Sequence, residues 1–141
     1  MTEIIKSVEN SPLIKVPQNP PHIKTNRFIT KAICHHAAQM ANDTDATAIS
    51  TLTNSGYTAF QISAWRPQSH VLVFTSNKII LNRLNLLWGV KTFYYDNLKS
   101  TDKTVVEINE IAFDKGYVEK EDFVVNLTAM PIKSRGMVNT L

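Results

Sequence analysis

Small hydroxyl residues gather in one short segment of this 141-residue chain, between an expected strand and an expected helix. The segment reads Thr53, Asn54, Ser55, Gly56, Tyr57 and Thr58. A helix N-terminus at the carboxyl end of a parallel strand favours anions, because its free N–H groups and the helix dipole both attract negative charge. Hydroxyl groups add donors, and Gly56 lets a ligand approach the backbone closely. The segment predicts a phosphate site, although taken alone it also fits an ordinary capped helix start.

A second loop with anion-binding character follows the fourth expected strand. It consists of Lys133, Ser134, Arg135 and Gly136. The carboxyl ends of parallel strands meet at the same edge of a sheet, which is where such sheets bind ligands. We therefore expect the basic loop to face the 53–58 turn and to clamp a phosphate through charge-assisted hydrogen bonds.

Residues for other chemistry are missing from the sequence. It contains no G-x-G-x-x-G, no G-K-[ST] and no acidic residue about 20 positions after the 53–58 turn, which argues against a dinucleotide or a triphosphate. Ser55 has no histidine base nearby in the sequence, and no general acid and base are paired. We expect a binding domain without catalytic residues.

Metal binding is not expected either. His35 and His36 are adjacent on an expected helix, so they point about 100° apart and cannot hold one metal together. We expect them to be surface histidines. Cys34 is the only cysteine, which excludes an internal disulfide and a cysteine-based metal cluster.

Composition is typical of a globular domain. The chain is 43% hydrophobic, which is ample for a core. Its net charge is only +3, and its basic residues are scattered along the sequence. Without a basic run interleaved with aromatic residues, nucleic-acid binding is not expected. No apolar run approaches the roughly 18 residues needed to span a membrane, and no signal peptide is apparent. We expect a cytoplasmic protein that does not bind membranes.

Strands and helices alternate along most of the chain, which predicts an α/β fold. The expected strands are 46–52, 71–75, 90–95, 122–129 and a fifth that starts at Met137. Helices are expected from Thr25 or Asn26 as cap to Ala41, over 57–66, from Asn77 as cap to Gly89, and from Ser100 or Thr101 to Gly116. Strands and helices that alternate with short connections between them favour a three-layer α/β/α domain. We expect a mostly parallel sheet of about five strands, with the last strand antiparallel.

The first 24 residues differ from the rest. Residues 2–10 show a short helical pattern with Ile4, Ile5 and Val8 on one face, and four prolines then break the chain. We expect a boundary here, with 1–24 as the end of a preceding domain plus a connector and 25–141 as the domain itself. Residues 1–24 should be mobile or docked on a neighbour through their apolar stripe.

Six motifs in order resemble the C-terminal domain of pyruvate kinase. They are Met1 to Glu9, Asn26 to Cys34, Thr53-Asn54-Ser55-Gly56-Tyr57-Thr58-Ala59, Arg66-Pro67 with Val73 to Asn77, Leu87-Trp88-Gly89-Val90, and Gly136 to Thr140. The resemblance covers nearly the whole chain. Met1 to Glu9 resembles the end of the last helix of that enzyme's barrel domain, and the third motif resembles its phosphate loop.

The resemblance implies a regulatory and subunit-assembly role in a homotetramer, with a sugar-phosphate or nucleoside-monophosphate effector. It places phosphoryl transfer from phosphoenolpyruvate to ADP, with Mg²⁺ and K⁺, in the barrel domain. The chain then reads as a fragment, cut just inside its final strand, that cannot turn over substrate. Two alternatives stay open: a free-standing phosphometabolite sensor, and a purely structural oligomerisation domain with an empty 53–58 turn.

One departure from the family's pattern concerns the effector. The loop before the last strand is short and glycine-rich in members regulated by a sugar bisphosphate, whereas Pro131 to Gly136 is longer and more charged. In those members a tryptophan and an arginine hold a second phosphate, and neither has a match in this sequence between Lys99 and Lys115. A monophosphate, or no effector at all, is consistent with this sequence.

Overall fold

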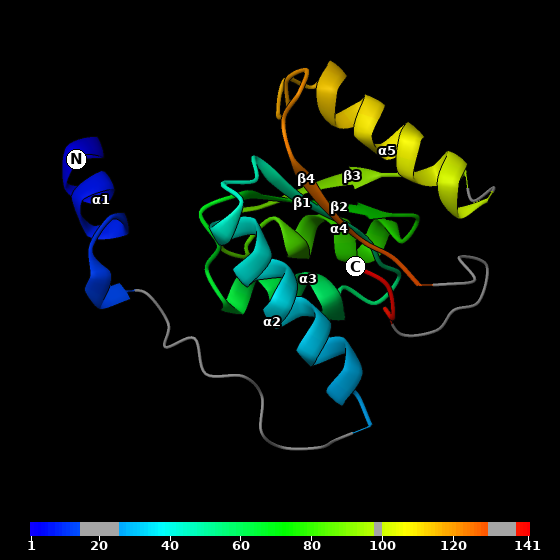
Figure 1. The fold of residues 1–141 in the computed structure, drawn as a ribbon, viewed down its shortest axis with the longest axis horizontal. Helices are drawn as coiled ribbons and strands as arrows, with labels where there is room; N and C mark the ends of the chain where they lie inside the picture. Colours follow the sequence, from blue (N-terminus) through cyan, green and yellow to red (C-terminus); the bar gives the residue numbers. More distant parts are fainter. Residues whose placement is uncertain (15–25, 98–99, 130–137) are drawn as a thin grey trace.

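The computed structural model describes residues 1–14, 26–97, 100–129 and 138–141, and shows an α/β domain (Figure 1). Its helices are α1 (Thr2–Glu9), α2 (Phe28–Asp43), α3 (Tyr57–Ala64), α4 (Lys78–Leu84) and α5 (Thr101–Asp114), with a 3-10 turn, η1, at Pro12–Ile14. Its strands are β1 (Ala48–Leu52), β2 (His70–Thr75), β3 (Val90–Tyr94) and β4 (Val124–Leu127). No helix in these ranges combines the length and the apolar content needed to cross a bilayer.

The four strands form one parallel sheet in the order β3-β2-β1-β4. The parallel arrangement confirms the expected fold class, but the expected count of five strands is wrong for the described residues. Met137 lies outside them, and 138–141 contribute one antiparallel bridge, Thr128 to Thr140, instead of a strand. A single bridged pair makes too few ladder hydrogen bonds to constitute a strand.

Helices cover both faces of the sheet, which makes the three layers that the sequence predicts (Figure 1). Residues of α2, α3 and α4 share one core with alternate strand residues such as Ile49 and Val73. Residues of α5 share the other core with the intervening strand residues, such as Leu72 and Phe74. Because successive side chains of a strand point to opposite faces, the run from Val71 to Phe74 in β2 must be apolar throughout to fill both cores.

Two helix starts carry side-chain caps, and one expected cap is absent. Asn77 Oδ1 accepts a hydrogen bond from Ile79 N at 3.0 Å, and Ser100 Oγ accepts one from Lys103 N at 3.4 Å, as the sequence predicts. The cap of α2 is Arg27, without a side-chain hydrogen bond, so the expectation of Asn26 is wrong. Thr25, the other expected cap, lies outside the described residues.

The helix after β2 is shorter than expected. α4 ends at Leu84, and the chain reaches Gly89 through successive turns in which Leu86 N and Leu87 N bond to carbonyls three residues earlier. Asn85 Oδ1 accepts a hydrogen bond from Thr92 N at 3.1 Å, which ties this segment to β3. That tie holds Asn85 beside the strand and ends the helix early.

The first helix contributes nothing to either core. α1 has no buried residue, and its apolar stripe is open to solvent, with Ile4, Ile5 and Val8 exposed by 66%, 50% and 52%. Large apolar side chains are normally buried against a partner. The stripe is thus available for contact with another domain or molecule.

Candidate functional site

The 53–58 turn lies at the point where the strand order reverses. β2 and β3 follow β1 on one side, whereas β4 pairs with β1 on the other. In open parallel sheets this reversal opens a crevice at the carboxyl ends of the strands, where ligands bind. The turn leaves β1 at that edge and enters α3 directly. Its place in the fold is the one that the sequence predicts for an anion site.

Hydrogen bonds within the turn hold it in a tight loop. Thr53 N donates to Phe74 O at 3.0 Å, which anchors the start of the turn to β2. Gly56 N donates to Thr53 Oγ1 at 3.1 Å, and Tyr57 N donates to Ser55 Oγ at 3.4 Å. Both hydroxyl oxygens thus act as acceptors, and of the two only the Ser55 hydroxyl belongs to an exposed residue.

Gly56 has the backbone conformation that glycine adopts most readily. Its φ is +78°, in the left-handed region that disfavours residues with a Cβ. The backbone conformation favours glycine strongly here, and a larger residue would also have to displace the Leu84 methyl group.

The N-terminus of α3 has no side-chain cap at Gly56. Among the described residues, no acceptor bonds the first-turn N–H groups of Thr58 and Ala59. Unsatisfied N–H groups at a helix start favour an anion or water. The turn therefore offers backbone donors as well as hydroxyl groups.

Exposure divides the predicted turn residues. Asn54 and Ser55 are exposed, whereas Thr53 and Thr58 are 8% and 5% exposed. The Thr58 carbonyl faces Cys34, whose Sγ lies 4.0 Å away. Because Thr58 is buried, its hydroxyl is not exposed as a donor for a ligand, contrary to the expectation from the sequence.

A second loop, after β2, supports the turn. Ser76 Oγ donates to Asn54 Oδ1 at 3.3 Å, and Asn77 Nδ2 donates to Asn54 O at 3.2 Å. Asn77 also caps α4 and donates its own N–H to Thr75 Oγ1 at 3.1 Å. Ser76 and Asn77 thus position the turn. Their place after the second strand was visible in the sequence, but their contacts were not.

Positive charge lies near the turn. The Arg27 guanidinium sits 4.3 Å from the centre of the Tyr57 ring, within cation–π distance. Residues 46–95 include four Lys or Arg residues and no Asp or Glu, so no carboxylate of this stretch opposes an anion. Sequence reasoning missed Arg27, because a basic residue before a helix gives no indication of which ring it will cover.

The predicted basic loop cannot be placed beside the turn. Lys133, Ser134, Arg135 and Gly136 all lie outside the described residues. Their position opposite 53–58 stays a prediction.

Other residues that could do chemistry have structural roles. His35 is only 4% exposed and packs on Trp65, with ring centroids 4.5 Å apart, so the expectation of a surface histidine is wrong. Burial and the neighbouring His36 both lower the pKa of His35. Burial raises the pKa of the Cys34 thiol to about 12, which leaves it without thiolate character. Within the described ranges, no three His, Cys, Asp or Glu side chains are grouped to hold a metal.

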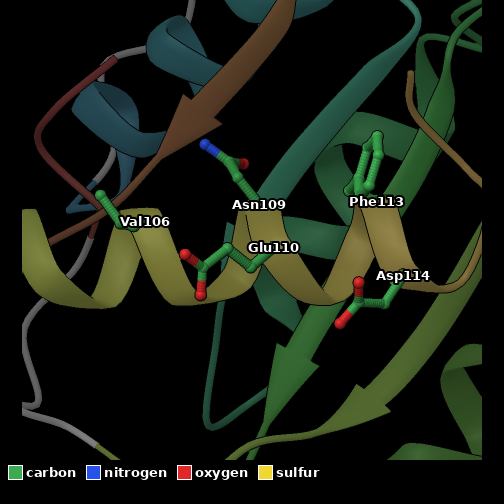
Figure 2. Close-up of a pocket in the computed structure, with 5 residues that line it drawn as sticks. All are labelled: Val106, Asn109, Glu110, Phe113 and Asp114. Atoms are coloured by element: carbon green, nitrogen blue, oxygen red, sulfur yellow. The ribbon is translucent and has the colours of Figure 1, made fainter. Parts of the chain in front are cut away.

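A hollow of about 430 Å³ lies away from the turn, along α5. Its five described lining residues all come from that one helix: Val106, Asn109, Glu110, Phe113 and Asp114. Figure 2 shows Val106, Asn109 and Phe113 along the upper edge of the helix, with Glu110 in front of it and Asp114 below. These five residues include no nucleophile and form no convergent cluster of polar groups, so the 53–58 turn is the better candidate site.

Comparison with known families gives one clear match. The family model described as "Pyruvate kinase, alpha/beta domain" matches residues 31–141. Curated relatives include a pyruvate kinase of Clostridium acetobutylicum, 33% identical over 117 residues, and one of Geobacillus stearothermophilus, 33% identical over 113 residues. These alignments cover 83% and 80% of this chain but 24% and 19% of the relatives. The chain thus spans about a quarter or less of these relatives.

Solved structures show the same fold. A crystal structure of a pyruvate kinase from Cryptosporidium parvum superposes with a TM-score of 0.71 at 24% sequence identity. The superposition covers 79% of this chain and 22% of that one. A second structure, of Cryptosporidium parvum pyruvate kinase in complex with ADP, gives a TM-score of 0.69 at 25% identity.

Proposed function

The chain belongs to the pyruvate kinase α/β domain family, and from this membership we propose that it is the C-terminal regulatory and subunit-assembly domain of a pyruvate kinase. The parent enzyme would transfer a phosphoryl group from phosphoenolpyruvate to ADP, giving pyruvate and ATP. Catalysis, with its Mg²⁺ and K⁺, would belong to a barrel domain that this sequence does not include. A cytoplasmic location suits such an enzyme.

The regulatory part of the proposal concerns residues 53–58. We propose that this turn binds the phosphate group of a sugar phosphate or a nucleoside monophosphate. The single observation that carries it is the uncapped start of α3 behind a glycine at φ +78°, set at the reversal point of the sheet. Backbone N–H groups, the hydroxyl of Ser55 and the helix dipole would act on the same anion.

Charged partners would raise the affinity of this site. We propose that Lys133 and Arg135 approach the phosphate from the loop after β4, with Ser134 and Gly136 completing that loop. A hydrogen bond to a charged group contributes about 1.5–3 kcal/mol, compared with about 1 kcal/mol for a neutral hydroxyl. The basic side chains should therefore matter more than Thr53.

The assembly part of the proposal rests on exposed apolar side chains. Ile4 and Ile5 on α1, Ile29 on α2 and Phe60 on α3 are each at least 50% exposed. We propose that α1 packs against the barrel domain of the parent enzyme, and that other subunits of a homotetramer cover the outward faces of α2 and α3.

A second candidate function is purely structural. The hydroxyl oxygens of Thr53 and Ser55 already accept hydrogen bonds from within the turn, and Asn54 is held by the loop after β2. A turn that is satisfied internally can persist without a ligand. In that case the domain would assemble subunits and bind no effector.

Calorimetry separates the two functions. The chain is titrated with ribose 5-phosphate, glucose 6-phosphate, AMP and fructose 1,6-bisphosphate. If the site binds phosphate, Lys133→Ala or Arg135→Ala should weaken binding about tenfold or more, and Thr53→Ala about fivefold.

Gly56→Val should abolish binding, because valine disfavours φ +78° and would crowd Leu84. Gly89→Val is the matched control. Gly89 also has positive φ, at +67°, but no atom lies within 4 Å of its added Cβ. Failure of all four ligands at millimolar concentration, on an assembled oligomer, would favour the structural function.

A further inference from the structure

The side of α5 that faces away from the sheet carries exposed apolar side chains. Thr104, Ile108 and Ala112 are the buried residues of this helix, and the last two share a core with the sheet. Because each residue of a helix turns by about 100°, Val106 and Phe113 lie on the opposite side of α5 from that core. Their side chains are 56% and 47% exposed, so an apolar stripe along the helix is open to solvent.

The hollow along this stripe has the spacing of a helix-packing surface. It measures about 430 Å³, and its described lining residues follow one another at i, i+3, i+4, i+7 and i+8, from Val106 to Asp114. Residues at this spacing form one face of a helix, and such a face is what a second helix packs against. The carboxylates of Glu110 and Asp114 border the apolar pair (Figure 2). An apolar stripe with an acidic border is therefore available for contact.

The charge of α5 is opposite in sign to that of the whole chain. The helix contains four carboxylates and one lysine, a net charge of −3, whereas the 141 residues together carry +3. A partner that covers the hollow takes Glu110 and Asp114 partly out of water, and this is unfavourable unless it brings cations to meet them. The charge pattern thus selects a basic partner.

We propose that the outer face of α5, formed by Val106, Asn109, Glu110, Phe113 and Asp114, binds a basic amphipathic helix of a partner protein. Apolar side chains of that helix cover Val106 and Phe113, and its lysine or arginine side chains lie beside the two carboxylates. Pairing of two α5 helices from two copies of this chain is disfavoured, because it brings carboxylates together. An anionic membrane surface is repelled for the same reason. The inference is independent of the anion site.

A synthetic helix tests this interaction on the full 141-residue chain. The probe is a capped peptide of leucine, alanine and lysine, with leucines at helical spacing on one side and lysines along both borders of that side. A matched peptide carries glutamate in place of every lysine. Fluorescence anisotropy of the labelled peptides measures binding. We expect the lysine peptide to bind at least about tenfold more tightly than the glutamate peptide, because only its charge complements the outer face of α5.

Two double variants locate the binding surface. Val106→Ser together with Phe113→Ser removes the apolar stripe and should weaken binding of the lysine peptide at least about tenfold. Glu110→Gln together with Asp114→Asn removes the two charges and should weaken binding about fivefold, since exposed ion pairs are individually weak.

Matched changes on α1 serve as controls. Ile4→Ser together with Val8→Ser removes a similarly exposed apolar pair, and Glu3→Gln together with Glu9→Gln removes two exposed carboxylates. None of these residues belongs to α5, so both control variants should bind the lysine peptide as tightly as the parent chain does.

Several results would overturn the inference. They are failure of the lysine peptide to bind at millimolar concentration, equal binding of the two peptides, and a loss of binding in the α1 variants as large as that in the α5 variants. Self-association of the chain that the variant with Val106→Ser and Phe113→Ser abolishes would also overturn it, in favour of a second copy. If that variant does not fold, as judged by circular dichroism, the carboxylate variant and the two peptides give the same test.

Discussion

Two threonines on neighbouring strands differ in how their buried hydroxyl groups are satisfied. Thr51 and Thr75 are both fully buried. Thr75 Oγ1 accepts a hydrogen bond from Asn77 N at 3.1 Å, whereas Thr51 Oγ1 has no partner among the described groups. A buried hydroxyl without a partner costs about 1–3 kcal/mol, and one that is bonded contributes about 1 kcal/mol. The two positions should respond oppositely to the same substitution.

We expect Thr51→Val to raise the free energy of unfolding by about 1 kcal/mol, because it removes an unsatisfied polar group at almost constant shape. Thr75→Val should lower it by a similar amount, because Asn77 N loses its acceptor. Urea denaturation of both variants and the parent chain measures these changes. Destabilisation by Thr51→Val as large as that by Thr75→Val would show that the Thr51 hydroxyl has a partner.

The burial of His35 predicts a pH dependence of stability. Burial and His36 lower the pKa of His35 below the ordinary value of 6.5. The unfolded chain therefore binds more protons at this residue than the folded one, and stability falls as the pH drops below about 6.5. Urea unfolding between pH 8 and pH 5 should show this loss, and His35→Gln should reduce it. His70→Gln is the control at an exposed histidine. An unchanged pH dependence of stability in the His35→Gln variant would contradict the assignment.

Elements of this domain differ in how far they depend on tertiary packing. β2 fills both cores, with Val71 and Val73 on one side and Leu72 and Phe74 on the other. α1, in contrast, buries none of its residues. An eight-residue helix is marginal in water without a packing partner. The domain's stability should therefore be sensitive to changes in β2 and indifferent to changes in α1.

A triple substitution tests the independence of α1. Replacing Ile4, Ile5 and Val8 by serine should change the free energy of unfolding of the chain by less than about 0.5 kcal/mol, since all three side chains are exposed. Ile49→Ala, at a fully buried position of β1, should cost about 2–5 kcal/mol in the same urea assay. A loss of more than about 1 kcal/mol in the triple variant would mean that the stripe packs on the domain in solution.

At the scale of the whole molecule, the described residues form a parallel sheet with helices on both faces (Figure 1). The turn after β1 and the exposed apolar side chains of α1, α2 and α3 are the surfaces that the proposed function uses. No group of ligating side chains is present in the described ranges, and the one cysteine has a thiol pKa of about 12. These observations agree with the regulatory and assembly role proposed above.

We therefore expect the 141-residue chain to produce no pyruvate from phosphoenolpyruvate and ADP, with Mg²⁺ and K⁺ supplied. A coupled assay for pyruvate measures this, with a complete pyruvate kinase as the positive control. Pyruvate formation above the no-protein control that follows the chain through successive purification steps, with host enzyme excluded, would refute the expectation.

Much of the architecture is determined by the sequence alone. The uninterrupted apolar run of β2 predicts a strand covered on both faces, and Asn77 and Ser100 mark helix starts through local capping chemistry. Alternation of strands and helices predicts the parallel sheet, and six motifs in order, with the 53–58 motif among them, predict the family that the comparisons confirm. These features depend on residues that are close in sequence, so local propensity and periodicity are enough to predict them.

Only the tertiary structure decided how distant residues meet. His35 is buried because α2 packs beside α3 and brings Trp65 against it. Arg27 reaches the Tyr57 ring, Asn77 holds Asn54, and Thr128 meets Thr140 across separations that no periodicity encodes. Periodicity identifies the buried face of a helix, but not which side chain of another element will lie against it. That depends on how whole elements pack, and so the supports of the site, unlike its motif, emerged only from the fold.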